Sequence, residues 1–215
     1  MAYDLGYIWG DGSTGYVTGT TKPQNLHLKC KTADENIILG IRDRLGSNHK
    51  ITRGVRLLDS GNLSYYTTVT ISNSEITRTL IEDHGVLPGK SFKNLHFPKN
   101  IPDDLFCHFA RGLFDADGST GQYFYDYGDQ NLAYFLGSPT FIYEFHSQLI
   151  KVYPVLTGKL PEINPHGLGQ LSYRSKRDIS NLYDFLYPEN EDFPFLGRKR
   201  EIMKKIKDSA LIINY

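Results

Sequence analysis

Cysteines and long apolar runs are scarce in this chain of 215 residues. The two cysteines, Cys30 and Cys107, show no C-x-x-C spacing, which argues against a disulfide framework and against a structural zinc site. No run of about 18 apolar residues is available to span a bilayer, and the first residues show no basic and apolar signal segment. We therefore expect an intracellular protein without membrane contact, in the cytoplasm of a prokaryote or within an organelle.

An excess of charge of one sign is also missing, because 24 basic residues balance 24 acidic ones. A neutral chain lacks the overall attraction that lysine and arginine provide toward phosphates. The distribution is uneven, however: between Lys22 and Arg56 the basic residues outnumber the acidic ones by eight to three. Such a cluster is either a solvated surface or a local nucleic-acid face, and charge alone does not separate the two interpretations.

An internal repeat divides the chain. Residues 4–15, DLGYIWGDGSTG, recur as ARGLFDADGSTG at 110–121, an offset of 106 residues. We predict a first half at 1–88, a linker at 89–101 and a second half at 102–215. The segment 85–102 around this linker contains three prolines, two glycines and no clear period. The periodicities predict the following elements. Strands are expected at 15–20, 25–31, 50–58, 64–71, 122–127, 131–136, 155–163 and 169–174, and helices at 34–45, 74–84, 139–153, 178–186 and from about 199.

Small residues recur four positions apart within the repeat, as Gly6 with Gly10 and Gly112 with Ala116. On a helix this spacing forms a smooth stripe along which two backbones can approach closely. We therefore expect the two copies to be helices that pack on each other. The glycines that follow, at 12 and 118, are expected to end each helix in the left-handed conformation.

Asp11 and Asp117 then fall at the last position of each helix. A carboxylate is disfavoured there by roughly 0.3 to 1 kcal/mol, since the helix C-terminus carries partial negative charge. A bound divalent cation would remove the conflict, and oxygen ligands suit Mg²⁺. An isolated Asp-Gly pair is usually only a turn, but its duplication favours a metal site.

Polar and apolar residues alternate along the second expected strand, where Leu26, Leu28 and Cys30 would face the core. The opposite face is either an ordinary solvated surface or one that lies in a DNA groove. Other expected strands repeat the polar pattern with Thr52 and Ser172, and this repetition favours a sheet that binds DNA. The residues expected to bind DNA are Asn25, His27, Lys29, Lys31, Lys50, Arg56, Gln170, Arg174 and Lys176.

The paired motifs resemble those of the LAGLIDADG homing endonucleases, in the two-repeat, single-chain form. The resemblance rests on FARGLFDADGS at 109–119 and on the approach IPDDL at 101–105. The first copy departs from the pattern, with Asp4 where an apolar residue is usual and Trp9 where the first acid is usual. The resemblance implies an α+β fold of two pseudo-symmetric αββαββα halves, with a saddle of antiparallel strands and the two motif helices packed at its centre.

The same resemblance implies a site-specific endonuclease that cuts both strands of a long DNA target, acting as a monomer without an obligate protein partner. It assigns metal binding to Asp11 and Asp117 with the preceding carbonyls of Gly10 and Ala116. Mg²⁺ is the expected metal, with Mn²⁺ as a substitute.

A lysine beside each scissile phosphate would stabilise the transition-state charge. The resemblance assigns this role to Lys90 and Lys199. Lys31 and Arg174 are the alternatives for the first and second halves.

Two binding functions on the same scaffold are the alternatives to an enzyme: an RNA maturase that helps an intron fold, and a DNA-binding regulator that does not cut. The presence of both acids favours the enzyme, because a protein that only binds has no electrostatic reason to direct paired carboxylates at phosphates. The GKS segment at 89–91 does not predict a nucleotide-binding loop, because Gly85 stands too close to it.

Overall fold

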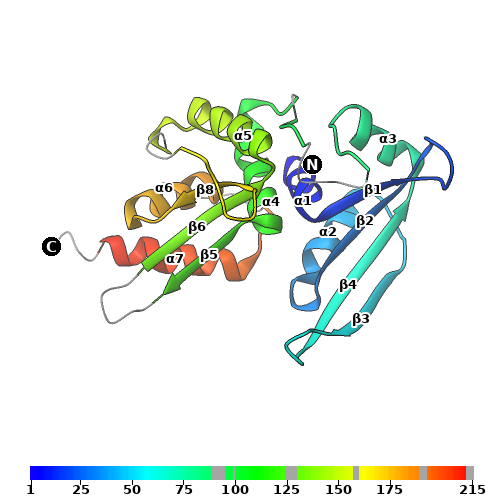
Figure 1. The fold of residues 1–215 in the computed structure, drawn as a ribbon, viewed down its shortest axis with the longest axis horizontal. Coiled ribbons are helices and arrows are strands. Elements are labelled where there is room, and N and C mark those ends of the chain that lie inside the picture. The colour runs from blue at the N-terminus through cyan, green and yellow to red at the C-terminus, as the bar shows by residue number, and fades with distance from the viewer. Residues whose placement is uncertain (89–94, 99, 124–129, 157–159, 189–192, 212–215) are drawn as a thin grey trace. The chain divides into compact units, whose positions relative to one another are not determined.

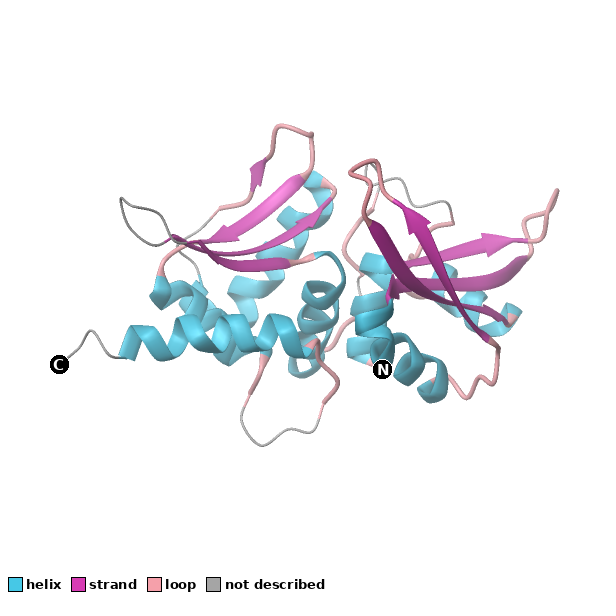
Figure 2. Cartoon of the chain, turned by 90° about the horizontal axis from the view of Figure 1, so that it is seen from below, coloured by secondary structure: helices cyan, strands magenta, loops and turns pink. Residues whose placement is uncertain are grey.

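Two four-stranded antiparallel sheets organise the chain, each with helices on one face (Figures 1 and 2). The computed structural model describes residues 1–88, 95–98, 100–123, 130–156, 160–188 and 193–211. These residues form two units, one comprising Met1 and residues 11–90, the other comprising residues 2–10 and 91–215. None of the helices in these segments is long and apolar enough to cross a membrane.

The first unit contains a sheet of strand order β1-β2-β4-β3, in which every neighbouring pair is antiparallel. Its strands are β1 (Gly12–Tyr16), β2 (Pro23–Lys31), β3 (Ile51–Leu57) and β4 (Leu63–Ser72). The helices α2 (Glu35–Arg44) and α3 (Ser74–Glu82) lie against β2, which is central. Leu26, Leu28 and Val69 from the sheet pack with Ile38 and Ile41 from α2 in the core of this unit.

The second unit repeats this arrangement with the strand order β5-β6-β8-β7. Its strands are β5 (Ser119–Tyr123), β6 (Gln130–Gly137), β7 (Glu162–Ile163) and β8 (Gly169–Tyr173). Its helices are α1 (Ala2–Asp11, of which residues 2–10 belong here), α4 (Phe106–Asp117), α5 (Pro139–Val152), α6 (Lys176–Leu186) and α7 (Gly197–Leu211).

Aromatic rings fill the core of the second unit. Phe135 of β6 lies with its ring centroid 5.3 Å from that of Phe114 and 4.8 Å from that of Phe145, which joins α4 and α5 to the sheet. Each such pair contributes about 0.5–1.5 kcal/mol beyond its buried area. This core supports the end of α4, where the second motif acid lies.

The structure confirms the α+β class, with two sheets related by the repeat, and most expected elements lie within a few residues of their predicted bounds. The strand expected at 122–127 overlaps β5 only at Gln122 and Tyr123, and residues 124–127 lie outside the described part of the chain. The strand expected at 15–20 is misplaced, because the chain enters β1 at Gly12, directly after the motif helix, and β1 ends at Tyr16. The strand expected at 155–163 is wrong over most of its described length. A short 3-10 helix covers Pro154–Leu156, and only Glu162–Ile163 pair with β8. Proline at 154 and 161 removes backbone donors that a longer ladder requires.

Candidate active site and nucleic-acid interface

The two motif helices, α1 and α4, touch along their small residues. A Cβ atom added at Gly6 would lie 2.0 Å from the carbonyl oxygen of Phe109, and one added at Gly112 would lie 2.0 Å from that of Tyr3. At Gly10 an added Cβ would lie 2.3 Å from the Cβ of Ala116. Because backbone atoms leave no room for a side chain at 2.0 Å, this interface requires glycine. The stripes predicted from the sequence are confirmed.

Each motif helix ends at its acid, α1 at Asp11 and α4 at Asp117. The expected left-handed glycine after each acid is wrong. Gly118 is extended, with φ −75° and ψ 165°, and Gly12 begins β1 and is absent from the glycines described with positive φ. Glycine is needed at 118 for space, since an added Cβ would lie 2.5 Å from the Phe114 ring and 2.6 Å from its carbonyl oxygen.

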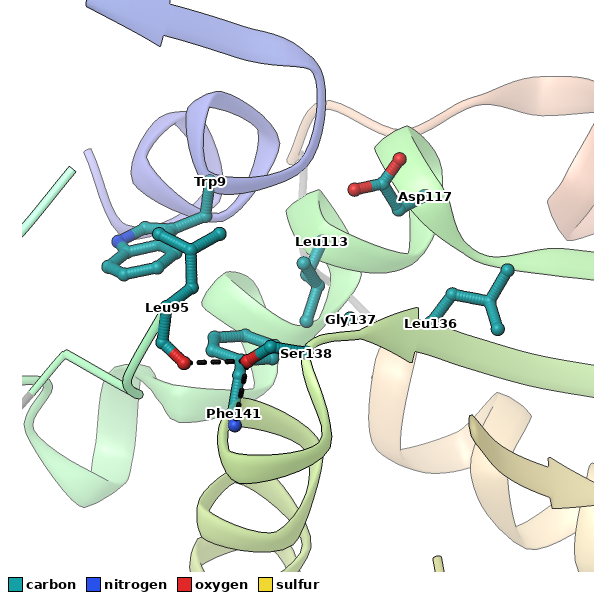
Figure 3. A pocket seen from close by; sticks show the side chains of 8 residues that line it. All are labelled: Trp9, Leu95, Leu113, Asp117, Leu136, Gly137, Ser138 and Phe141. Atoms are coloured by element: carbon teal, nitrogen blue, oxygen red, sulfur yellow. Dashed lines mark hydrogen bonds between the residues drawn. The ribbon is translucent and has the colours of Figure 1, made fainter. Parts of the chain in front are cut away.

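Asp117 is one of the residues that line a small cavity of the second unit (Figure 3). Trp9 of α1 lies at one side of this cavity, stacked on Phe141 with centroids 5.4 Å apart. Asp117 also adjoins the end of α1, because its Oδ2 atom would lie 3.2 Å from a Cβ at Gly10. The second acid is thus half-buried beside the C-terminus of the first motif helix.

Asp115 occupies the repeat position that corresponds to Trp9, and both side chains are buried, each with 3% of its surface exposed. The Oδ2 atom of Asp115 accepts hydrogen bonds from the Tyr3 hydroxyl at 2.9 Å and from the Leu196 amide at 2.8 Å. Its Oδ1 atom is buried with no hydrogen-bond partner among the described residues. Burial raises the pKa of this carboxyl to about 6, although the nearby Lys199 charge opposes the shift. Asp115 is therefore a structural acid rather than a metal ligand.

Lys199 is buried in the first turn of α7, with 4% of its surface exposed. Its ammonium group donates to the carbonyl oxygens of Phe114 at 2.6 Å, Asp115 at 2.8 Å and Gly118 at 2.6 Å. Three donors thus meet three acceptors at the end of α4, where a positive charge is stabilising. In this structure Lys199 holds the turn that carries Asp117, and its contact with a phosphate stays a prediction. Lys90, expected to be its counterpart, lies outside the described residues.

The donors around the two acids fit a hard cation. Carboxylates and backbone carbonyls are the oxygen ligands that Mg²⁺ accepts, and a carboxylate at a helix C-terminus gains from a nearby positive ion. No group of three or more His, Cys, Asp or Glu that could hold a metal occurs within the described part of the chain. Asp11 or Asp117 would therefore supply one carboxylate, together with the carbonyl that precedes it, and phosphate and water oxygens would complete the ligands of a cation such as Mg²⁺.

Cys30 lies half-buried in the first unit. Burial, followed by the charges of Asp34 and Asp11, raises the pKa of its thiol to about 12. The thiolate is the reactive form of cysteine, and almost none is present near neutral pH.

The first unit presents one continuous polar face. The β2–β4 register pairs Asn25 with Ser72, His27 with Thr70, and Lys29 with Thr68, while Leu26 and Leu28 face the core. Lys29 lies over the Tyr66 ring, 4.2 Å from its centroid, and His27 contacts Thr70 at 2.9 Å.

The other basic residues predicted to bind DNA in the first half are Lys31, Lys50 and Arg56. Lys31 pairs with Tyr66 at the end of β2, and Arg56 pairs with Ser64 on the same face. Lys50 is exposed immediately before β3. Arg53 points to the helical side instead, where it pairs with Glu35 at 2.8 Å.

The second unit differs at the positions predicted to bind DNA. Gln170 lies on the face opposite the helices and donates to Ser172 at 2.7 Å, and Ser172 is itself buried. Arg174 is exposed directly after β8. Lys176 is the first residue of α6 and is half-buried, so it belongs to a helix rather than to the strand surface.

Three apolar side chains that the sequence reasoning passed over share the face of Gln170. They are Leu132, Tyr134 and Leu136 of β6, which alternate with the buried Ala133 and Phe135. In the sequence, this strand is apolar at both alternating sets of positions. Such a pattern is typical of a strand buried on both sides, so it did not mark these residues as exposed.

Comparison with known proteins identifies similar folds but no similar sequences. No protein-family model matches this chain, and no curated protein matches it in sequence. Meganuclease I-SmaMI bound to uncleaveable DNA is similar in structure, with a TM-score of 0.64 and 13% identity over 99% of this chain and 91% of that one. The homing endonuclease I-WcaI bound to its DNA recognition sequence has a TM-score of 0.58 and 13% identity, covering 94% of this chain and 86% of that one.

A third solved structure, the LAGLIDADG homing endonuclease I-GzeII in complex with its DNA target, gives the same result. Its TM-score is 0.58 at 12% identity, covering 99% of this chain and 90% of that one. At such identities the likeness establishes the fold, and it extends over both halves of the chain.

Proposed function

We propose, from the premise that this chain has the fold of the LAGLIDADG homing endonucleases, that it is a site-specific DNA endonuclease that uses Mg²⁺ to hydrolyse both strands of a long target. The observation that carries the proposal is the pair of acids at the ends of the motif helices. Asp11 and Asp117 each end a helix, and glycine-mediated contact holds the two helices together.

In the proposed site, Asp11 with the Gly10 carbonyl and Asp117 with the Ala116 carbonyl hold the metal. When bound, the metal supplies Lewis-acid stabilisation of the phosphate oxygens and favours deprotonation of the attacking water. The helix ends contribute by fixing the carboxylates, because a misplacement of about 1 Å can cost on the order of a hundredfold in rate.

The lysines support the same chemistry in different ways. Lys199 holds the end of α4 through its three carbonyl contacts, and its charge favours the ionised form of Asp115 against the effect of burial. For Lys90 we propose the role of a cation at the phosphate, with Lys31, exposed at the end of β2, as the alternative in the first half. Stabilisation of developing charge by such a group is worth several kcal/mol in other enzymes, about 2.7–4 kcal/mol per donor.

DNA binding in this proposal rests on the strand faces, with the cations of the first sheet contacting phosphates and bases. The protein acts as a monomer, because one chain carries both acids. Mn²⁺ is expected to replace Mg²⁺, since it accepts the same oxygen ligands.

Cleavage of a selected duplex tests this function. Duplexes bound in Ca²⁺ are selected from a randomised library, and the enriched sequence is then incubated with protein in Mg²⁺, in Mn²⁺ or in EDTA. We expect double-strand cleavage with either metal and none in EDTA. Enrichment of a sequence that is never cut would support a DNA-binding regulator, and selective binding of structured RNA in place of DNA would support a maturase.

A further inference from the structure

The two sheets present chemically different surfaces on the sides away from their helices. On the first sheet the register places His27, Lys29, Lys31 and Arg56 on this face. Its other described members are serine, threonine, asparagine, glycine and tyrosine, and none is acidic. This surface carries the groups that neutralise phosphates and donate to guanine.

The corresponding face of the second sheet carries no lysine, arginine or histidine within its described strands, and Glu162 of the edge strand β7 lies on it opposite Gln170. Leu132, Tyr134 and Leu136 form a row along β6, each partly exposed. Tyr123, 46% exposed, continues this surface on β5, and Gln170 lies opposite Leu136 on β8. In the sequence, residues 119–137 as a whole contain no basic side chain.

The row also adjoins the proposed centre of cleavage. Leu136 and Asp117 line the same small cavity (Figure 3), so the row begins beside the second motif acid and continues away from it along β6. Alternate residues of a strand are about 6.6–6.8 Å apart, which corresponds to about two base-pair steps. The row therefore samples successive positions of one half of a target rather than a single base.

We propose that the second sheet reads an A·T-rich half-site through the 5-methyl groups of thymine in the major groove, with Gln170 contacting adenine. This inference rests on the proposed function, and it deepens it by assigning the two halves of the target different base chemistry. Thymine is the only base with an apolar group on its major-groove edge, and glutamine matches the donor and acceptor of adenine. Because the described strands of this face carry no cation, they gain little from phosphates, and their contribution to affinity depends on such contacts.

Replacing thymine by deoxyuridine tests the proposal, because it removes only the methyl group and keeps every hydrogen bond. The probe is the duplex enriched from the randomised library in Ca²⁺, with deoxyuridine introduced in one half at a time. We expect about threefold to fivefold weaker binding for each contacted methyl in the half-site of the second sheet, in line with the burial of one methyl-sized group. The same change in the other half is expected to alter affinity less than twofold.

A double-mutant cycle assigns the contact to the row. In the Leu132→Ala variant, the thymine and deoxyuridine forms of the contacted position should bind equally, because the partner of the methyl group has been removed. Leu160→Ala is the matched control, since Leu160 is 79% exposed outside the strands, and it should keep the full deoxyuridine effect. A thermal melt of each variant verifies that it is folded.

The binding results distinguish failure of this inference from failure of the proposed function. An enriched site whose binding ignores deoxyuridine in both halves overturns the inference and leaves the proposed function standing. Equal competition by single-stranded DNA of the same sequence also overturns it, because the tyrosines would then stack on unpaired bases. If no sequence is enriched at all, the proposed function fails and this inference fails with it.

Discussion

Asp115 and Trp9 occupy the same position in the two copies of the repeat, but their side chains differ in chemistry. Trp9 stacks on Phe141, whereas Asp115 is a buried carboxylate with one oxygen bonded twice and the other without a partner among the described residues. Tryptophan therefore fits at position 9, because its neighbour there is an aromatic ring. This departure from the family pattern does not affect Asp11, the acid two positions later.

The Asp115→Asn variant should show a pH-dependent gain in stability. The pKa of Asp115 is raised from 3.8 to about 6 in the folded state, so the folded protein binds the proton more tightly than the unfolded chain does. Protonation of Asp115 therefore stabilises the folded protein, fully below pH 3.8, and this stabilisation is lost as the pH rises through 6. Asparagine keeps an acceptor for Tyr3 and Leu196 without a charge, so we expect it to be more stable than the wild type at pH 7.5 by up to about 3 kcal/mol.

Urea denaturation of both proteins between pH 4 and pH 8 measures this effect. The difference between them should shrink toward zero at the acidic end. A difference that stays constant with pH would show that Asp115 does not titrate in this range.

Lys199→Met tests the lysine as a support for the end of α4. Three backbone carbonyls lose the ammonium donor, of which that of Phe114 still accepts from the Gly118 amide at 3.0 Å. Because a buried acceptor without a partner costs about 1–3 kcal/mol, we expect unfolding free energy to fall by at least that amount. Lys204→Met, at an exposed position of the same helix, is the control and should change stability by less than about 0.5 kcal/mol. Equal melting temperatures for the two variants would contradict the assigned contacts.

At the level of elements, the motif helices are the part of the fold that the sequence predicts most completely. Gly6, Gly10, Gly112 and Ala116 indicated a close helix pair. The structure confirms it, because a Cβ atom added at Gly6 or Gly112 would lie 2.0 Å from a carbonyl oxygen of the other helix. The left-handed glycines were mispredicted because a glycine's sequence position does not show whether it is needed for its φ angle or for space. At Gly118 the need comes from the Phe114 ring, a contact inside the fold.

Gly112→Leu should disturb both catalytic centres together, because it forces α1 and α4 apart. Overpacking of this kind costs about 1–3 kcal/mol or more, and the displaced acids should slow cleavage of both strands. A duplex labelled differently on each strand, together with a thermal melt, measures both effects. Slower cutting of one strand alone, with an unchanged melting temperature, would show that this helix pair does not couple the two acids.

At the scale of the whole molecule, a chain without net charge has to concentrate its cations on one surface in order to bind DNA. Lys29→Glu and Lys50→Glu should weaken binding strongly and flatten its salt dependence, since both residues are exposed at the first sheet. Lys151→Glu is the control, because Lys151 lies on α5 and pairs with Asp103 at 2.8 Å. Equal losses for all three variants would contradict binding through the strand face.

The sequence predicts which strand face is exposed well in the first half of the chain and poorly in the second half. Alternation of polar and apolar residues identified Asn25, His27, Lys29 and Lys31 because one face of β2 is core and the other is solvated. On β6 both faces carry apolar residues, so alternation could not reveal which side is exposed. The contact of Lys199 with α4 joins residues more than 80 positions apart in the chain, and only the folded structure shows it.

The most direct test of the central claim is strand-resolved digestion of the selected duplex in Mg²⁺ by the wild type, Asp11→Asn and Asp117→Asn. The account predicts that the wild type cuts both strands and that neither variant makes a double-strand break. Both variants should bind the duplex within about tenfold of the wild type, because affinity comes from the strands. Double-strand cleavage at the wild-type rate by either variant would contradict the account.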